Sequence, residues 1–380
     1  MTQPDLRSII ERAPLVTCLG PGGVGKTTIS AVLALHGAAT KRRSLVLTID
    51  PARRLADALN LPELTNDPIE ISSFDKMHPG GTLSALMLDP TATFDHMVAM
   101  LIPDDERRQS LLDNRYYQHM SRTLAGTLEY MAVERLYALT SSRDYDVVVL
   151  DTPPTSNALD FIDAPDRLSN FFSDKVMRWF LPSESSSWTT RLLDRAGSRA
   201  LGLIGKVAGE EFIEDTLGFF AAFKDMLSSF QQRGERIGAL LRDPETVFII
   251  ICGPDPARVE EAKTIDLRLR ESGCRAQAFI INRVDTPFLP QEVDATETIH
   301  RATELLGGSA ERERVQSFIS RLESLRRARD EAAGQHAEAV AALRAHAGDR
   351  PVFTAPRVPP GNSARAALLA IYVGLFADGS

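Results

Sequence analysis

The amino-acid sequence predicts an α/β fold in which a doubly wound, mainly parallel sheet carries an inserted helical subdomain. Two observations support this fold class. Short apolar runs rich in β-branched residues alternate with segments of helical periodicity, which is the pattern of a parallel sheet with right-handed helical crossovers. One connection, between the runs that end at Leu150 and begin at Thr246, has about ninety residues, too long for a simple crossover.

The predicted strands are short, mainly apolar runs, as expected for strands covered on both faces. They are Leu15–Leu19, Ser44–Ile49, Thr82–Leu88, Asp146–Leu150, Thr246–Cys252, Ala276–Ile281 and Pro351–Thr354. The clearest helical patterns are Thr27–Thr40, Asp255–Ser272 and Ser363–Phe376.

The chain divides into three segments, which are the two parts of a single core and an insertion between them. We assign residues 1–150 to the first part, with a helical segment at 91–140, residues 151–245 to the insertion, and residues 246–380 to the second part. In the insertion, Phe and Met residues recur at helical spacing from Phe212 to Phe230, and Pro182–Trp188 has the composition of a loop. This apolar stripe fits either a buried helical core or a hydrophobic groove. The charged segment Ser309–Ala347 predicts a solvated pair of helices.

Composition excludes several classes of protein. With 43% hydrophobic and 25% charged residues, the chain of 380 residues is globular rather than disordered. A net charge of -8 disfavours a nucleic-acid partner. Cys18 and Cys252 lie in predicted strands, no CxxC pair is present, and this cysteine usage fits a reducing cytoplasm. The N-terminus lacks the apolar core of a signal peptide, and no apolar run is long enough to span a membrane.

The segment Gly20–Thr27 matches the phosphate-loop pattern G-x-x-x-x-G-K-[ST], between a predicted strand and a predicted helix. Its glycines allow backbone N–H groups to surround phosphate oxygens, and the helix adds its positive end. Lys26 is expected to neutralise phosphate charge, and the Thr27 hydroxyl to bind Mg²⁺. The alternative is a glycine-rich turn without a ligand. The pattern with its flanks favours a P-loop nucleotide hydrolase that uses ATP and Mg²⁺.

Two aspartates follow predicted strands, at the edge of the sheet where ligands of doubly wound folds bind. Asp50 is a candidate for positioning the attacking water, although it could instead cap the helix that follows it. Asp151 ends the run Val147–Leu150 and is expected to hold Mg²⁺ through a water. The stiff polar loop Thr152–Ser156 is a candidate sensor of the γ-phosphate.

These segments together resemble the ATPases of the arsenite-pump and guided-entry family, whose guided-entry members target tail-anchored proteins. The likeness rests on the phosphate loop, on Thr48–Leu59 as switch I and on Asp151–Phe161 as switch II. It also rests on Ile281–Arg283, where an Asn reads adenine, and on Thr354–Arg357, a loop that closes over the base.

The resemblance implies a role for each matching residue. Asp50 and Lys26 are the implied catalytic residues, and Thr27 and Asp151 the implied Mg²⁺ site. The nucleotide-binding positions it implies are Gly20, Gly22, Gly23, Val24, Gly25, Lys26, Thr27, Thr28, Asn282 and Pro356. In targeting members, the region that matches the insertion forms a groove for hydrophobic clients.

Three departures qualify the resemblance. Pro21 stands where the family carries a signature lysine that reaches the partner's nucleotide in a dimer. The CxxC of the interfacial zinc site is missing, and so is a cysteine triad for arsenite. The pattern is most similar to a bacterial subgroup of the family.

The sequence and the resemblance together predict a cytoplasmic ATPase that forms a homodimer or a heterodimer with a paralogue, and they leave its task open. The first hypothesis is an ATP-driven switch that handles a hydrophobic protein client or a membrane partner. The second is a slow regulatory ATPase paired with a lysine-bearing paralogue, which Pro21 favours. The third is the catalytic subunit of an arsenite pump, which the cysteines disfavour. We expect no nucleic-acid partner.

Overall fold

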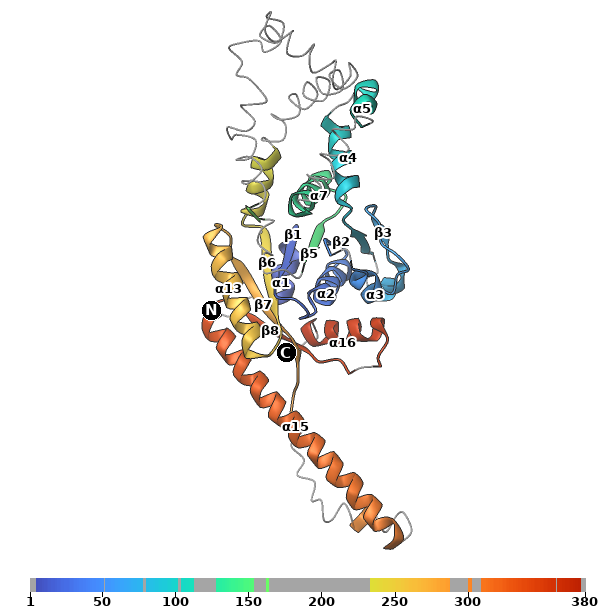
Figure 1. The fold of residues 1–380 in the computed structure, drawn as a ribbon, viewed down its shortest axis with the longest axis vertical. Coiled ribbons are helices and arrows are strands. Elements are labelled where there is room, and N and C mark those ends of the chain that lie inside the picture. The colour runs from blue at the N-terminus through green and yellow to red at the C-terminus, as the bar shows by residue number, and fades with distance from the viewer. Residues whose placement is uncertain are drawn as a thin grey trace, which may run out of the picture.

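The computed structural model shows a central sheet with helices on both faces (Figure 1). It describes residues 5–50, 52–77, 80–101, 104–112, 128–153, 162–163, 233–287, 300–302, 309–359 and 361–376. Most of the predicted insertion, including the stripe from Phe212 to Phe230 and the loop Pro182–Trp188, lies outside these residues.

The sheet has eight strands in the order β3-β4-β2-β5-β1-β6-β7-β8. Every neighbouring pair is parallel except β3 and β4. This confirms the doubly wound, mainly parallel fold class, and both predicted parts of the core contribute strands to the one sheet. The strands are β1 (Leu15–Leu19), β2 (Arg43–Thr48), β3 (Ile69–Glu70), β4 (Thr82–Met87), β5 (Val147–Asp151), β6 (Thr246–Cys252), β7 (Ala276–Val284) and β8 (Val352–Pro356).

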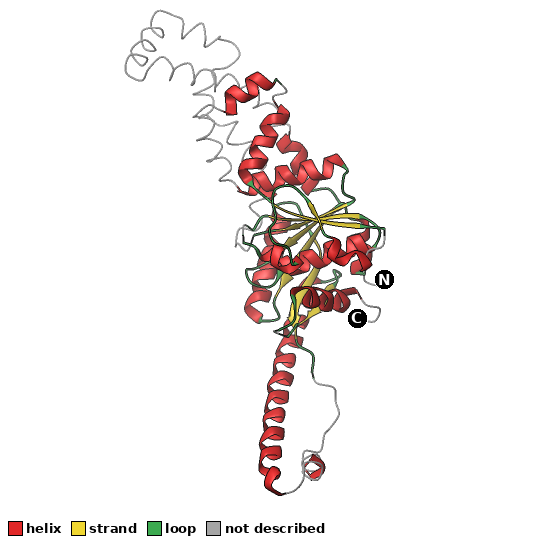
Figure 2. Ribbon diagram, turned by 90° about the vertical axis from the view of Figure 1, so that its right-hand side faces the viewer, coloured by secondary structure: helices red, strands yellow, loops and turns green. Residues whose placement is uncertain are grey.

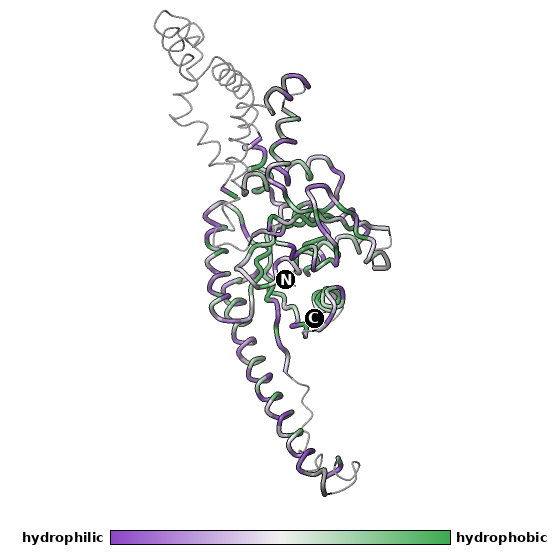
Figure 3. Tube along the Cα trace, turned by 45° about the vertical axis from the view of Figure 1, so that its right-hand side comes forward, coloured by the Kyte–Doolittle hydropathy of each residue, from purple (hydrophilic) through white to green (hydrophobic). Residues whose placement is uncertain are grey.

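Two separate hydrophobic cores explain why the strands are mainly apolar on both faces. In β1, Leu15 and Leu19 belong to one core, whereas Val16 and Cys18 belong to the other. Side chains of a strand alternate between the two faces of its sheet, so a strand covered on both faces has mainly apolar residues on each of them. Hydropathy along the chain shows the same arrangement, with apolar residues concentrated around the sheet (Figure 3).

Each face of the sheet has its own layer of helices. One core includes residues of α1 (Leu6–Arg12), α2 (Lys26–Ala39), α3 (Arg54–Leu59) and α16 (Ala364–Phe376). The other includes residues of α4 (Pro90–Leu101), α7 (Leu128–Ser142), α13 (Pro256–Glu271) and α15 (Ser309–Ala347). Other described elements are the 3₁₀ helix η1 (Ser72–Met77), α5 (Asp105–Leu112), which follows α4, and a helical stretch at residues 233–241.

The prediction of a helical pair at Ser309–Ala347 was wrong, because these 39 residues form the single helix α15. The segment contains no proline, and its one glycine, Gly334, costs a helix only about 1 kcal/mol. The C-terminal part packs on α13, β7 and β8. The other end extends away from the sheet (Figures 1 and 2), where Phe318 and Leu325 are exposed.

None of the helices in the described ranges combines the length and the apolar character that a membrane span requires.

Candidate nucleotide site

The phosphate loop connects β1 to α2 and owes its shape to two glycines. Gly20 has φ +151°, and a Cβ atom there would lie 1.9 Å from the Ile251 carbonyl oxygen on β6. Gly25 has φ +89°, and a Cβ atom there would lie 2.4 Å from Nδ2 of Asn282. The backbone conformation disfavours a side chain at both positions, and at Gly20 the β6 carbonyl also leaves no space for one. The neighbouring strands therefore hold the loop close against the edge of the sheet.

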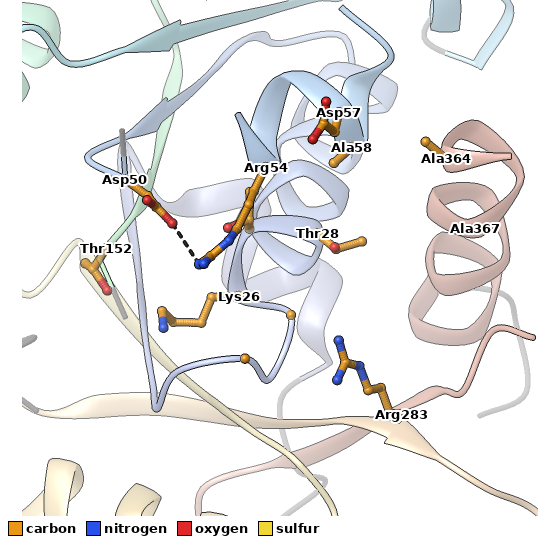
Figure 4. A pocket seen from close by; sticks show the side chains of 13 residues that line it. Lys26, Thr28, Asp50, Arg54, Asp57, Ala58, Thr152, Arg283, Ala364 and Ala367 are labelled. Atoms are coloured by element: carbon orange, nitrogen blue, oxygen red, sulfur yellow. Dashed lines mark hydrogen bonds and ion pairs between the residues drawn. The ribbon is translucent and has the colours of Figure 1, made fainter. Parts of the chain in front are cut away.

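The helix α2 begins at Lys26 and has no side chain that caps its first turn. The first N–H groups of a helix have no partner within the helix, and its dipole places positive charge there. This end of α2 opens into a pocket of about 530 Å³, shown in Figure 4. The pocket is lined by Gly23, Gly25, Lys26, Thr27, Thr28, Asp50, Arg54, Asp57, Ala58, Thr152, Arg283, Ala364 and Ala367. An uncapped helix end in a polar pocket is a site for an anion such as phosphate.

Lys26 lies against its own loop. Its ammonium group donates to the carbonyl oxygens of Gly20 at 2.8 Å and of Pro21 at 3.0 Å. Burial lowers the pKa of Lys26, while the nearby carboxylate of Asp151 opposes that shift. The cation is therefore positioned by backbone oxygens at the entrance to α2, next to the N–H groups that would receive phosphate.

Asp151 is fully buried behind the pocket at the end of β5. Its carboxylate accepts hydrogen bonds from the hydroxyls of Thr48 at 2.9 Å and Ser30 at 3.5 Å. Burial raises the pKa of Asp151 to about 6, although hydrogen bonds from Thr27 and Thr48 lower it. The hydroxyls and the carboxylate together form a set of oxygen donors of the kind that Mg²⁺ prefers.

Asp50 follows β2 and faces the pocket. Its carboxylate accepts from the backbone N–H of Ala52 at 3.0 Å and pairs with the guanidinium of Arg54 at 2.9 Å. The alternative role of Asp50 as a helix cap is wrong, because α3 begins four residues later with Arg53 as its cap residue. The Asp50 carboxylate therefore faces the pocket and does not cap a helix.

Thr152 is the described start of the predicted sensor loop. Its hydroxyl donates to the Cys18 carbonyl oxygen at 2.7 Å, and the residue lines the pocket. The rest of that loop, from residue 154, lies outside the described residues.

Asn282 and Pro356 lie near the site but do not line the pocket. The side-chain amide of Asn282 donates to the Val24 carbonyl oxygen at 2.8 Å, so in this structure it supports the phosphate loop from β7. Pro356 ends β8, opposite Val284 of β7. Their contacts with adenine stay predictions.

Sequence reasoning missed several residues that line the pocket: Asp57, Ala58, Arg283, Ala364 and Ala367. Arg283 carried a usable signal, because it directly follows the predicted adenine-reading Asn. It adopts φ +63°, unusual for a residue other than glycine. The alanines gave no chemical signal at all.

A phosphate loop after a central strand, with an aspartate at the end of the neighbouring strand, defines a P-loop nucleotide hydrolase. The family model described as anion-transporting ATPase matches residues 14–305. The chain belongs to the anion-transporting ATPase family, and it is an ATPase.

Curated proteins show the same relationship. The chain is 26% identical over 286 residues to the ATPase GET3 of Malassezia globosa, covering 75% of this chain and 77% of that protein. It is 28% identical over 267 residues to the ATPase GET3A of Arabidopsis thaliana, with 70% and 65% covered. An ATPase ASNA1 homolog of Cryptosporidium parvum is 25% identical over 309 residues, with 80% and 75% covered.

Proposed function

We propose that the chain hydrolyses ATP with Mg²⁺ in the pocket at the start of α2. The observation that carries this proposal is the convergence of Lys26, Asp50 and Thr27 on one uncapped helix end. Backbone N–H groups of the loop and Lys26 bind the β- and γ-phosphates. Asp50 positions the attacking water and accepts its proton.

The Thr27 hydroxyl and Asp151, the latter through a water, are the residues that would hold Mg²⁺. The ion supplies neutralisation of the charge between the β- and γ-phosphates. Within the described residues, no three His, Cys, Asp or Glu side chains form a metal cluster. This agrees with Mg²⁺, which in nucleotide sites uses one or two protein ligands together with phosphates and water.

Two substitutions test these roles. We expect Lys26→Ala to abolish binding of a fluorescent ATP analogue, because the loop loses its only long cation. We expect Asp50→Asn to bind the analogue but to lose turnover by roughly 100-fold or more. Lys263→Ala, which removes a lysine paired with Glu260 on α13, is the matched control. Turnover of Asp50→Asn at the wild-type rate would contradict the role of that carboxylate.

We further propose that the ATP state is coupled to the insertion at 151–245, which handles a hydrophobic protein client or a membrane partner. Support comes from chain connectivity, because the insertion begins at Asp151 and Thr152, both at the site. The resemblance to guided-entry ATPases and the Phe- and Met-rich composition of the insertion agree with this.

Amide hydrogen exchange of the intact chain tests the coupling. We expect exchange within 154–232 to differ between ADP and a non-hydrolysable ATP analogue, and a transmembrane-segment peptide to slow exchange there in one nucleotide state. Identical exchange in both states, with no effect of the peptide, would refute the coupling.

A second candidate is a slow regulatory ATPase that pairs with a lysine-bearing paralogue. Pro21 favours it, because this residue supplies neither an N–H group nor a cation to the loop. Light scattering with and without a Mg²⁺–ATP analogue, with turnover followed on the same sample, separates the two candidates. A nucleotide-dependent dimer with turnover supports a self-sufficient switch, whereas a monomer, or a dimer that binds without turnover, supports the missing paralogue.

The cysteines give little support to an arsenite pump. Cys18 belongs to one hydrophobic core, whereas Cys252 and Cys274 belong to the core on the opposite face of the sheet. Burial raises the pKa of Cys18 and of Cys252 to about 12, so neither is a thiolate at neutral pH. We therefore expect arsenite to leave ATP turnover unchanged.

A further inference from the structure

The pocket contains a cation that the phosphate-loop motif does not include. Arg54 is the first residue of α3, and its side chain extends back over the phosphate loop toward Asp50 (Figure 4). Its Nη1 atom lies 2.9 Å from Oδ2 of Asp50, and 57% of the side chain is exposed to solvent. A guanidinium group therefore lies in the pocket between the phosphate loop and the Asp50 carboxylate (Figure 4).

The loop itself leaves a need for positive charge. Pro21 contributes none, and Lys26 is bonded to the carbonyl oxygens of Gly20 and Pro21. In phosphoryl transfer, negative charge spreads over the γ-phosphate oxygens, and an arginine supplied within the same chain can stabilise it. The planar guanidinium is suited to two oxygens of a phosphate at once.

We propose that Arg54 is the cation that binds the γ-phosphate, and that its pairing with Asp50 is the resting arrangement of the site. This inference rests on the ATP site proposed above. The γ-phosphate competes with Asp50 for the guanidinium group. When Arg54 moves to the phosphate, the Asp50 carboxylate becomes free to bind the attacking water. ATP thus activates its own hydrolysis through a local exchange of ionic partners, whereas ADP, which lacks the γ-phosphate, leaves the pair intact.

A purely structural role for the pair predicts different behaviour. Because Arg54 is more than half exposed, its ion pair with Asp50 contributes little to stability. If the pair only held α3 in place, Arg54→Ala would fold normally and would bind ADP and ATP as the wild type does. The difference between the two nucleotides is therefore the informative quantity.

The test measures the affinity of the intact chain for ADP and for ATPγS, together with kcat and KM, in Arg54→Ala and Arg54→Lys. For Arg54→Ala we expect ADP affinity within about twofold of the wild type, ATPγS affinity about tenfold weaker and kcat roughly 100–1000-fold lower. Arg54→Lys should recover part of the ATPγS affinity, because lysine keeps the positive charge but lacks the planar guanidinium that binds two oxygens at once. Arg258→Ala, which removes an exposed guanidinium paired with Glu261 on α13, is the matched control and should change none of these values.

Removal of the competing carboxylate gives an independent arm. In Asp50→Asn the guanidinium has lost its charged partner, so we expect ATPγS to bind several-fold more tightly while ADP affinity stays the same. The double variant that combines Asp50→Asn with Arg54→Ala should not show this increase in ATPγS affinity.

Three results would overturn the proposal: equal weakening of ADP and ATPγS by Arg54→Ala, wild-type or faster turnover of that variant, or an unchanged ATPγS affinity in Asp50→Asn. Unchanged ADP affinity in Lys26→Ala would instead overturn the site on which the proposal rests.

Discussion

Replacing Asp151 by Asn should make the nucleotide-free protein more stable while it removes Mg²⁺-dependent turnover. Burial raises the pKa of Asp151 from its ordinary 3.8 to about 6 in the folded chain. A carboxyl group with a raised pKa favours the folded state fully only below pH 4, and that contribution is lost as the pH rises through 6. The buried charge therefore costs about 1.36 × (6 − 3.8), or about 3 kcal/mol, at pH 8. At pH 5 the same relation gives about half of that cost.

The assay is unfolding of wild type and Asp151→Asn in EDTA without nucleotide, at pH 8 and pH 5. A gain of about 3 kcal/mol in a chain of 380 residues raises Tm by about 4 °C. The gap should fall to about half at pH 5. Asp50→Asn is the matched control, because its carboxylate already pairs with Arg54 and its neutralisation should bring no gain. An Asp151→Asn protein that is no more stable than the wild type at pH 8, or a gap that is the same at both pH values, would refute the reasoning.

Three further predictions concern stability. Gly20→Ala should destabilise the chain by about 2–6 kcal/mol, since its Cβ atom would lie 1.9 Å from a β6 carbonyl oxygen; Gly23→Ala, with no atom within 4 Å, should cost much less in urea unfolding. Burial lowers the pKa of His36 to about 4. As the pH drops below 6.5, the unfolded chain is therefore protonated before the folded chain, and the free energy of unfolding falls. His36→Phe lacks this group, so between pH 8 and pH 5 its free energy of unfolding should rise by about 2 kcal/mol relative to that of the wild type. Asp266 accepts two hydrogen bonds from the buried Arg350, so Asp266→Ala should lower the free energy of unfolding by about 3–5 kcal/mol, and a loss below 1 kcal/mol would contradict that pairing.

The strands were predictable because burial on both faces leaves a continuous apolar run. The bounds of Leu15–Leu19 and Thr246–Cys252 were predicted to the residue. β3 was missed, since two residues at an antiparallel edge produce no periodicity. The helical pair at Ser309–Ala347 was wrong because charge periodicity indicates a helix but not where one ends, and the segment lacks a strong stop signal.

The site was predictable where chemistry and spacing coincide, as in the phosphate loop and at Asp151. The pairing of Arg54 with Asp50 follows from the local turn into α3. The sequence did not show this turn, because it left the role of Asp50 open between positioning a water and capping a helix. The wall formed by Ala364 and Ala367 depends on where α16 packs. Alanine is among the residue types most often buried in cores, so these two residues gave no sign of a site.

The order of the strands also has a consequence for synthesis on the ribosome. β1, which leads into the phosphate loop, lies between β5 and β6, yet β6 begins only at Thr246. While residues 152–245 are translated, one edge of β1 has no partner strand. At about 5–20 residues per second, those roughly ninety residues take about 5–20 s. During that interval the nascent core presents an unpaired strand edge, which can pair wrongly with another chain. The nucleotide site is therefore completed late, after the ribosome has delivered β6 and β7, and ATP can stabilise only the nearly finished protein.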